Sequence, residues 1–376
     1  MVGSEKVAAA ATEALAQEAV AWASSNGLMM VKPGGDGAKD PTTDVTFIHA
    51  PFSLLPNLLP RQEFDRAVAL SPLMNLLVDR IASDRDWLLE AVDPVLESDP
   101  FTAKLVELMK ATPPQRLRLG IHRSDFMFHG PPGEEEGEGG DSMPRRFLQI
   151  ELNTIASSFG CISARVSELH RYLISRFSSS SESESSKSES GSMARALEAA
   201  LESIGTSAAN VGTADATSDQ GGSWAAAACA QGALPENPTL RELPAALAAA
   251  HGVYGCKSAV VAFVVQPGER NVMDQRLLEL RLWEDHQIQV RRLTLRDIAE
   301  RGSLGGVGAA GGKPGSGLMV DQEEVAVVYF RAGYTPDDYP SEVEWEARSR
   351  IELSDAVKCP TLAYHLAGTK KVCPPA

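Results

Sequence analysis

Two segments in the first half of the chain alternate between apolar and polar positions with a period of two. They are Arg116-Leu-Arg-Leu-Gly-Ile-His-Arg123 and Arg146 to Asn153. This period is typical of a strand with one buried face. The sequence between them, His129 to Met143, is rich in Gly, Pro and Glu, which favours a turn. The pattern predicts an antiparallel hairpin with a long acidic tip.

Apolar residues recur at helical spacing on both sides of this hairpin. Pro51, Pro56 and Pro60 interrupt the segment that precedes most of these helices. We expect the helices that precede the hairpin to form a layer that packs over the sheet. The predicted helical ranges are Glu5 to Ser24, Asn75 to Ala82, Trp87 to Val92, Phe101 to Lys110, and Ala164 to Phe177.

Strand and helix patterns alternate in the second half of the chain. This succession predicts an α/β unit with a mostly parallel sheet. The Gly-rich stretch Gly302 to Gly317 is expected to be an insertion between two of the elements. The predicted strands are Ser258 to Gln266, Ile288 to Leu295 and Val325 to Arg331, and the predicted helices are Arg241 to His251, Met273 to Glu284, Arg296 to Arg301 and Ser341 to Ser354.

Composition and charge exclude several classes of function. The 376 residues are 43% hydrophobic and 23% charged, with a net charge of −15, which argues against a general nucleic-acid or anionic-membrane surface. Five cysteines without CxxC spacing fit a reducing compartment better than a disulfide framework or a zinc site. No apolar run is as long as a membrane span. The N-terminus has the pattern of neither a secretory signal nor a transit peptide, so we expect a cytosolic protein, with a plastid as the lesser alternative.

Two low-complexity stretches lie between the halves of the chain. Ser178 to Ser192 is made largely of Ser and Glu, and Thr206 to Ala233 is rich in Ala, Gly, Ser and Thr. Such sequence cannot bury enough apolar surface to offset the entropy of ordering. Both are expected to belong to a disordered insertion.

Candidate chemistry lies at the end of the second hairpin strand. Glu151 and Asn153 are two residues apart, so in a strand they point to the same face. A carboxylate and a carboxamide form a pair of hard oxygen ligands suited to Mg²⁺. The alternative is a half-buried strand whose polar face is only solvated. The loop after the strand, Thr154 to Gly160, offers N–H and hydroxyl groups to an anionic substrate.

Five blocks in the same order carry a resemblance to a known family. They are Gly120 to Phe128, Gln149 to Gly160, Glu269 to Gln275, Val328 to Tyr334, and Leu366 to Lys371. In these blocks the chain resembles eukaryotic-type glutathione synthetases, which are ATP-grasp ligases. The resemblance covers most of the chain, from about Val45 to Lys371.

The resemblance implies a fold class and a division into domains. The fold would be α/β (α+β): an incomplete ATP-grasp-type fold, in which an antiparallel sheet with a helical layer is joined to an inserted α/β substrate-binding domain. Residues 1–177 would form the N-terminal part of the catalytic region and 178–236 the disordered insertion. Residues 237–368 would be the substrate-binding domain, and 369–376 the start of the ATP-binding C-terminal part.

The resemblance also implies a reaction. ATP would phosphorylate the cysteinyl carboxylate of γ-glutamylcysteine, and the amine of glycine would attack the acyl phosphate to give glutathione. Such chemistry needs positioned phosphates, Mg²⁺ and cations that hold carboxylates, and it needs no protein nucleophile. No partner other than these small molecules is implied, apart from the homodimer that the family forms.

Residue roles follow from matching positions. Glu151 and Asn153 match the Mg²⁺ ligands of the family, and Met127, Glu151 and Lys370 match residues beside ATP. The positions that match substrate contacts are Arg123, Ile155, Ala156, Ser157, Ser158, Glu269, Arg270, Asn271, Gln275, Arg331, Ala332, Gly333 and Tyr334.

Alternatives stay open at several of these positions. Asn271 and Asp274 have the pattern of a helix-capping cluster. Arg123 and Lys370 would be ordinary surface residues in isolation, and Met127 would be core. Two positions depart from the family: Ala156 stands where a serine is frequent, and Ala332 where an aspartate is common.

Family members continue beyond the Lys370 region with a Gly-rich lid loop, further lysines, an acidic Mg²⁺ ligand and a basic clamp. We see none of these in the sequence. We therefore expect little or no ligase activity from residues 1–376 and exposed apolar surface where those parts would pack. The alternatives are a non-catalytic relative that binds γ-glutamyl peptides or a full-length partner, and a ligase that uses a different acceptor amine.

Overall fold

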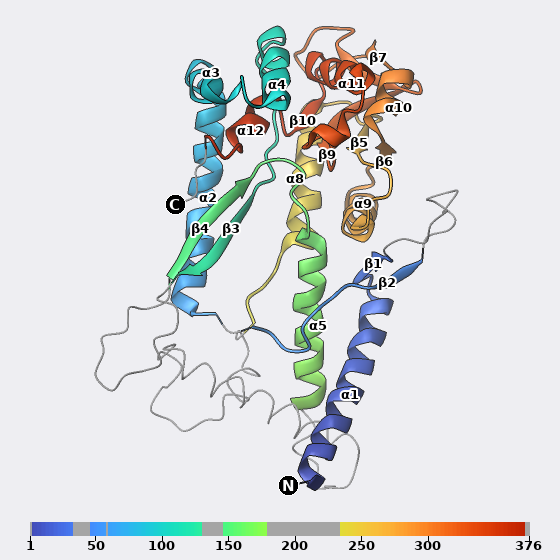
Figure 1. Cartoon of the computed structure of the whole chain (residues 1–376). Helices are drawn as coiled ribbons and strands as arrows, with labels where there is room; N and C mark the ends of the chain where they lie inside the picture. The colour runs from blue at the N-terminus through green and yellow to red at the C-terminus, as the bar shows by residue number, and fades with distance from the viewer. Residues whose placement is uncertain (1, 33–45, 58, 130–145, 179–233, 373–376) are drawn as a thin grey trace, which may run out of the picture.

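The structure, a computed structural model, describes residues 2–32, 46–57, 59–129, 146–178 and 234–372 (Figure 1). The acidic hairpin tip and nearly all of the predicted insertion, 178–236, lie outside these residues. The described part contains a six-stranded mixed sheet, two separate two-stranded sheets and helices around them. The predicted mixture of a small antiparallel sheet, a helical layer and an α/β unit is confirmed.

The helices α1 (Val2–Ser25) and α5 (Gly160–Ser178) lie side by side at one end of the molecule (Figure 1). Leu15, Ala19 and Ala23 of α1 form a buried cluster with Leu169 and Leu173 of α5. A short antiparallel pair follows α1, formed by β1 (Met29–Val31) and β2 (Phe47–His49). This pair was not predicted from the sequence, because three-residue strands carry no readable period.

The predicted hairpin is confirmed, but its first strand lies further along the chain. Strand β3 (Arg123–His129) pairs antiparallel with β4 (Arg146–Asn153). The predicted strand 116–123 instead runs beside β10 (Val357–Cys359), where Arg118 forms an isolated bridge with Lys358. Its alternation reflects burial rather than hairpin pairing, because Leu117, Leu119 and Ile121 pack against the core of the large sheet.

A helical layer packs beside this hairpin, as predicted. It consists of α2 (Arg61–Ser83), α3 (Arg85–Val92), α4 (Pro100–Ala111) and α12 (Leu362–Ala367). Carboxylates at the N-caps, Asp84 for α3 and Asp99 for α4, accept hydrogen bonds from backbone amides of the first turns. Helix α2 begins 14 residues before the predicted Asn75 and continues through Pro72, which the sequence pattern had not indicated.

The large sheet has the order β6-β5-β9-β8-β7, and β10 pairs with β9. Strands β6 (Val290–Leu293), β5 (Val260–Val264) and β9 (Glu323–Phe330) run parallel to one another, as predicted. Strand β10, which was not predicted, is also parallel to β9. The interpretation of 302–317 as a simple insertion is wrong at its ends. These ends form β7 (Gly302–Gly305) and β8 (Gly317–Val320), which extend the sheet in antiparallel fashion.

Helices cover both faces of this sheet. One buried cluster joins Val261 and Phe263 of β5 to α8 (Thr239–Tyr254) and α9 (Val272–His286). The other joins Ala262 and Val264 to α10 (Leu295–Arg301) and α11 (Glu342–Leu353). Successive strand residues therefore alternate between two apolar layers, which explains why the Val-rich runs carry almost no polar positions.

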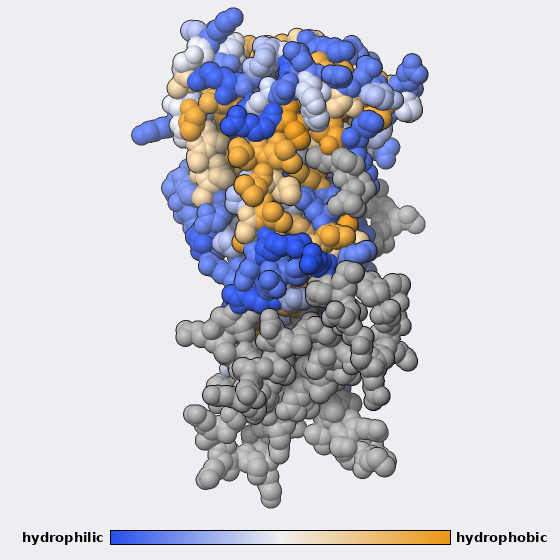
Figure 2. Space-filling model, turned by 90° about the vertical axis from the view of Figure 1, so that its left-hand side faces the viewer, coloured by the Kyte–Doolittle hydropathy of each residue, from blue (hydrophilic) through white to orange (hydrophobic). Residues whose placement is uncertain are grey.

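One large helix surface stays exposed. Val68, Leu73, Leu76 and Leu77 of α2 are 49–60% exposed. Figure 2 shows apolar side chains gathered on the side of the molecule that carries α2 and the hairpin. The sequence predicts exposed apolar surface where further elements of the family would pack, and that location stays a prediction. No helix in the described part of the chain is both long enough and apolar enough to cross a membrane.

Acid is expected to destabilise the fold in part through His365 of α12. Burial, with a smaller contribution from the charge of Arg348, lowers the pKa of His365 from 6.5 to about 3. The His365 imidazole therefore takes up a proton near pH 6.5 in the unfolded chain, whereas it stays neutral in the folded protein. Stability should fall as pH drops below 6.5, by roughly 1 kcal/mol per pH unit from this group. Carboxylates also destabilise the fold as pH falls, so the contribution of His365 is measured as a difference between variant and wild type. Between pH 7 and 5, the melting temperature of His365→Leu should drop less than that of wild type. Equal drops would contradict this role for His365.

Candidate functional site

The end of the hairpin gathers the polar residues predicted to bind metal. Register pairs Arg123 with Asn153 and Asp125 with Glu151, so the four side chains share one face. Arg123 donates from Nε and Nη2 to the two carboxylate oxygens of Asp125, at 2.8 and 3.1 Å. Asn153 donates from Nδ2 to the same carboxylate, at 3.1 Å. Asp125, which sequence reasoning did not single out, therefore orients both Arg123 and Asn153.

This arrangement leaves oxygen ligands for a cation. With its NH₂ group held by Asp125, Asn153 has its Oδ1 atom left, on the same strand face as the half-buried Glu151. In the described part of the chain, no group of three or more His, Cys, Asp or Glu residues could hold a metal ion. Two oxygen ligands still fit Mg²⁺, which usually keeps several waters and is held by one or two side chains plus substrate phosphates. The Mg²⁺ site stays a prediction.

Met127 lies on the same face of the hairpin. Arg123, Asp125 and Met127 alternate along β3, and Met127 pairs with Leu148 after a register shift between Asp125 and Phe126. The Met127 side chain is 59% exposed. The interpretation of Met127 as core is therefore wrong, and a position beside a ligand on this open face remains a prediction.

The loop after β4 is held by its neighbours rather than open. Ser157 Oγ lies within hydrogen-bonding distance of the backbone carbonyls of Ile121 and Asn153, at 3.1 and 3.2 Å. Ile155 packs against the sheet core, and Ser158 is half-buried. Ala156 adopts a left-handed backbone with a φ of 49°, which costs free energy for a residue with a Cβ. The Ser157 hydroxyl therefore has a structural bond already, and backbone groups and Ser158 are left for a substrate.

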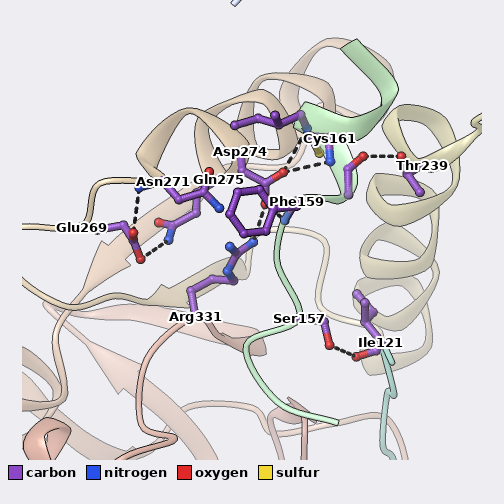
Figure 3. Close-up of polar contacts among 12 residues, drawn as sticks. Ile121, Ser157, Phe159, Cys161, Thr239, Glu269, Asn271, Asp274, Gln275 and Arg331 are labelled. Carbon is purple, nitrogen blue, oxygen red and sulfur yellow. Dashed lines mark hydrogen bonds and ion pairs between the residues drawn. The ribbon is translucent and has the colours of Figure 1, made fainter. Parts of the chain in front are cut away.

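Asp274 on α9 joins the end of this loop to β9 (Figure 3). Its Oδ1 accepts hydrogen bonds from the amides of Cys161 and Ile162, at 2.9 and 3.1 Å. Its Oδ2 accepts from the Phe159 amide at 3.1 Å and from Arg331 Nη1 at 3.0 Å. The expected capping cluster is therefore wrong for α9: Asp274 caps α5 instead, and the Asn271 side chain makes no capping bond.

The Asp274–Arg331 pair is buried, with side chains 2% and 3% exposed. Burial acts to lower the pKa of Arg331, but the neighbouring Tyr329 and Asp274 raise it, and the net shift is upward. The hydrogen bonds that Arg123 donates to Asp125 raise the pKa of Arg123, and the charge of Arg331 lowers it by less. The buried ion pair ties the start of α9 to the end of β9.

Glu269, Asn271 and Gln275 form a chain of contacts at the start of α9. Glu269 Oε1 accepts from the backbone N–H of Asn271 at 2.7 Å, and Glu269 Oε2 lies 3.4 Å from Gln275 Nε2. The fully buried Gln275 also accepts from Arg292 Nη2 at 2.7 Å. Asn271 is 7% exposed, and neither Nδ2 nor Oδ1 has a hydrogen-bond partner among the described residues. An unpaired buried amide is costly unless a ligand or water satisfies it.

The remaining predicted residues lie around this centre. Asp338 Oδ2 accepts from the amides of Gly333, Tyr334 and Thr335, at 2.9, 3.0 and 3.2 Å. These amides are therefore engaged, while the Tyr334 side chain is 42% exposed and Ala332 is buried. The carbonyl of Arg270 accepts from Val31. Lys370 is exposed just after α12, and the described contacts do not bring it to the other residues.

Comparison with known proteins assigns the chain to a family. The family model for the ATP-binding domain of eukaryotic glutathione synthase matches residues 9–373. The chain is 36% identical to glutathione synthetase from Dictyostelium discoideum over 95% of its own length and 64% of the relative. It is 35% identical to chloroplastic glutathione synthetase from Solanum lycopersicum, covering 95% and 54%, and 31% identical to the Homo sapiens protein, covering 96% and 62%.

A solved structure agrees in fold. A glutathione synthetase-like effector from Globodera pallida, in its apo form, superimposes with a TM-score of 0.63 at 22% identity, covering 95% of this chain and 63% of that one. The chain thus shares the mixed α/β fold of that protein. It belongs to the eukaryotic glutathione synthase family, which confirms the resemblance seen in the sequence. It spans between about half and two thirds of the length of the curated relatives.

Proposed function

We propose that this chain forms the dipeptide-binding part of a glutathione synthetase. The observation that carries the proposal is the buried side-chain amide of Asn271, near the Asp274–Arg331 ion pair. Neither polar atom of this amide has a hydrogen-bond partner within the described residues. A site built to hydrogen-bond a polar substrate has this character before the substrate binds. The substrate would be γ-glutamylcysteine, with ATP and glycine as the co-substrates.

Each group has a distinct part in this proposal. Asn271 donates to and accepts from the γ-glutamyl end of the dipeptide, and Glu269 pairs with its α-ammonium. Gln275 has its amide engaged with Arg292 and Glu269, so it supports Glu269. Arg331 donates a hydrogen bond from Nη1 to Asp274, and its other N–H donors suit a substrate carboxylate.

The residues on the hairpin face would bind the ATP phosphates and the metal ion. Arg123, fixed by Asp125, neutralises carboxylate or phosphate charge near the reacting group. Glu151 and Asn153 would hold Mg²⁺, which supplies positive charge to the phosphates of ATP. In the ligation, the cysteinyl carboxylate takes the γ-phosphoryl group of ATP and releases ADP. The amine of glycine then attacks the acyl phosphate, forms the amide bond and releases phosphate.

A second function rests on the same geometry. The groups that would bind the dipeptide all lie within the described chain, whereas no group of three or more His, Cys, Asp or Glu residues in that part of the chain could hold a metal ion. The chain would then bind γ-glutamyl peptides without joining them to glycine. The absence of measurable glutathione with γ-glutamylcysteine, glycine and Mg-ATP, together with dipeptide binding, would favour this second function; robust glutathione formation would exclude it.

The proposed site predicts a loss of affinity in Asn271→Ala. Calorimetric titration of wild type should detect γ-glutamylcysteine binding, and the variant should bind at least tenfold more weakly, because each lost hydrogen bond to a buried group costs about 1–3 kcal/mol. Asn26→Ala serves as the control, since the Asn26 amide bonds only to a carbonyl at the end of α1. Equal affinity of wild type and Asn271→Ala would place the site elsewhere, and no binding by wild type would refute the function.

A further inference from the structure

One carboxylate serves three segments that meet at the proposed dipeptide site. Asp274 belongs to α9, accepts from the amides at the start of α5 and pairs with Arg331 after β9. We propose that Asp274 is a positioning residue: it fixes the Arg331 guanidinium relative to the 155–159 loop, so that both act on the dipeptide together. This inference rests on the proposed function and deepens it.

The local sequence explains why α5 needs a distant carboxylate. Phe159 precedes the first helical residue, Gly160, and a phenylalanine side chain has no hydrogen-bond acceptor. The first amides of a helix have no partner within the helix. Asp274 satisfies those of Phe159, Cys161 and Ile162 from more than 110 residues away. The helix start and the loop before it are therefore anchored to α9.

The same carboxylate determines how Arg331 can be used. Nη1 of Arg331 is held at 3.0 Å by Asp274 Oδ2, and Nε has no partner among the described residues. A guanidinium carries five donors in a planar fork, so fixing one nitrogen fixes the direction of the others. Figure 3 shows Arg331 pointing toward Asp274, with Asn271 and Gln275 on the adjoining helix. Without the carboxylate, the buried guanidinium would lose its counter-charge and its orientation.

A second consequence concerns the loop. Ser157 is fixed at its position by Ile121 and Asn153, and Phe159 is fixed by Asp274. Phe159 also has a left-handed backbone, with a φ of 68°, which a single favourable contact must help to hold. Loop and guanidinium thus share one anchor, and a change at Asp274 alters both sides of the site.

The test is the affinity for γ-glutamylcysteine, measured by calorimetry on the full chain alongside its melting temperature. Asp274→Asn keeps the size of the side chain but removes the charge, and we expect at least a tenfold loss of affinity. Asp99→Asn is the matched control, because Asp99 caps α4 with two amide bonds at 3.1 Å and lies in the other helical layer. It should lower the melting temperature and leave the affinity unchanged. An Asp274→Asn variant that is less stable but binds as wild type does would overturn the proposal.

A double-mutant comparison separates positioning from mere stability. If Asp274 acts partly through Arg331, Asp274→Asn should cost less affinity in the Arg331→Lys background than in wild type; the same tenfold loss in both backgrounds would contradict this. Should Asp274→Asn fail to fold, Asp274→Glu keeps the charge but displaces it by a methylene, and it should fold and bind more weakly. Wild-type affinity in that variant would overturn the proposal. No binding by wild type would instead refute the proposed function itself.

Discussion

Replacing Arg331 with leucine should lower the free energy of unfolding by about 3–5 kcal/mol, the cost of breaking a buried ion pair from one side. Both side chains are at most 3% exposed, and the Nη1–Oδ2 distance is 3.0 Å. The variant would leave the Asp274 carboxylate buried without a cation. Three backbone amides would still bond to it, which places the expected loss toward the lower end of this range. Urea denaturation measures it.

The control for this prediction is Arg241→Leu. Arg241 pairs with Glu236 and Glu242, as Arg331 pairs with Asp274, but its side chain is 65% exposed. Exposed pairs contribute little because water solvates both partners. The urea midpoint of Arg241→Leu should therefore stay at the wild-type value. If Arg331→Leu shifted the midpoint no more than Arg241→Leu, the buried pair would not hold these elements together.

The sequence predicted the α/β unit well because burial there is two-sided. Val260 to Val264 and Val325 to Phe330 are buried on both faces of the sheet, so their apolar runs are unbroken and easily read. The same runs fix where their carboxyl ends lie. For this reason Glu269, Asn271 and Arg331, which follow such strands, could be expected near one another.

Other elements depended on tertiary contacts that no local pattern reports. The segment 116–121 alternates like a strand but packs its apolar residues on the core of the large sheet, and the true strand begins at Arg123. Glycine-rich sequence suggested a loop at 302–317. Gly317 is nevertheless part of a strand, where an added Cβ would lie 2.7 Å from the Gly305 carbonyl. Close approach of two backbones, rather than flexibility, explains that glycine.

The site was predicted in part. The resemblance named candidate residues at β4, α9 and β9, and their roles stay predictions; it did not show how they bond to one another. Asp125 and Asp274 were missed as organising groups because each works through residues distant in sequence or on a partner strand. A signal existed for Asp274: α5 begins after Phe159 without a Ser, Thr, Asp or Asn at its cap, which implies that a distant group satisfies its amides.

A second buried pair predicts a large effect away from the site. Arg348 and Glu352 of α11 are 0% and 1% exposed, with Nη2 and Oε1 3.1 Å apart. The Arg348 guanidinium also lies 4.1 Å from the centroid of the Phe330 ring. Glu352→Leu should lower the free energy of unfolding by about 3–5 kcal/mol in urea, because the arginine charge would stay buried without its carboxylate.

The double variant Arg348→Met/Glu352→Leu tests the cause of that loss. Replacing both members of a buried pair with apolar residues is often neutral or stabilising, so the double variant should be more stable than Glu352→Leu alone.

Lys358 lies in the same cluster, where burial lowers its pKa from 10.5 to about 8. Once Glu352 is replaced, Lys358 can release its proton, whereas an arginine cannot. The unpaired charge of Arg348 should therefore determine how much free energy of unfolding Glu352→Leu loses. If the double variant were no more stable than Glu352→Leu, packing around Phe330 would determine that loss instead.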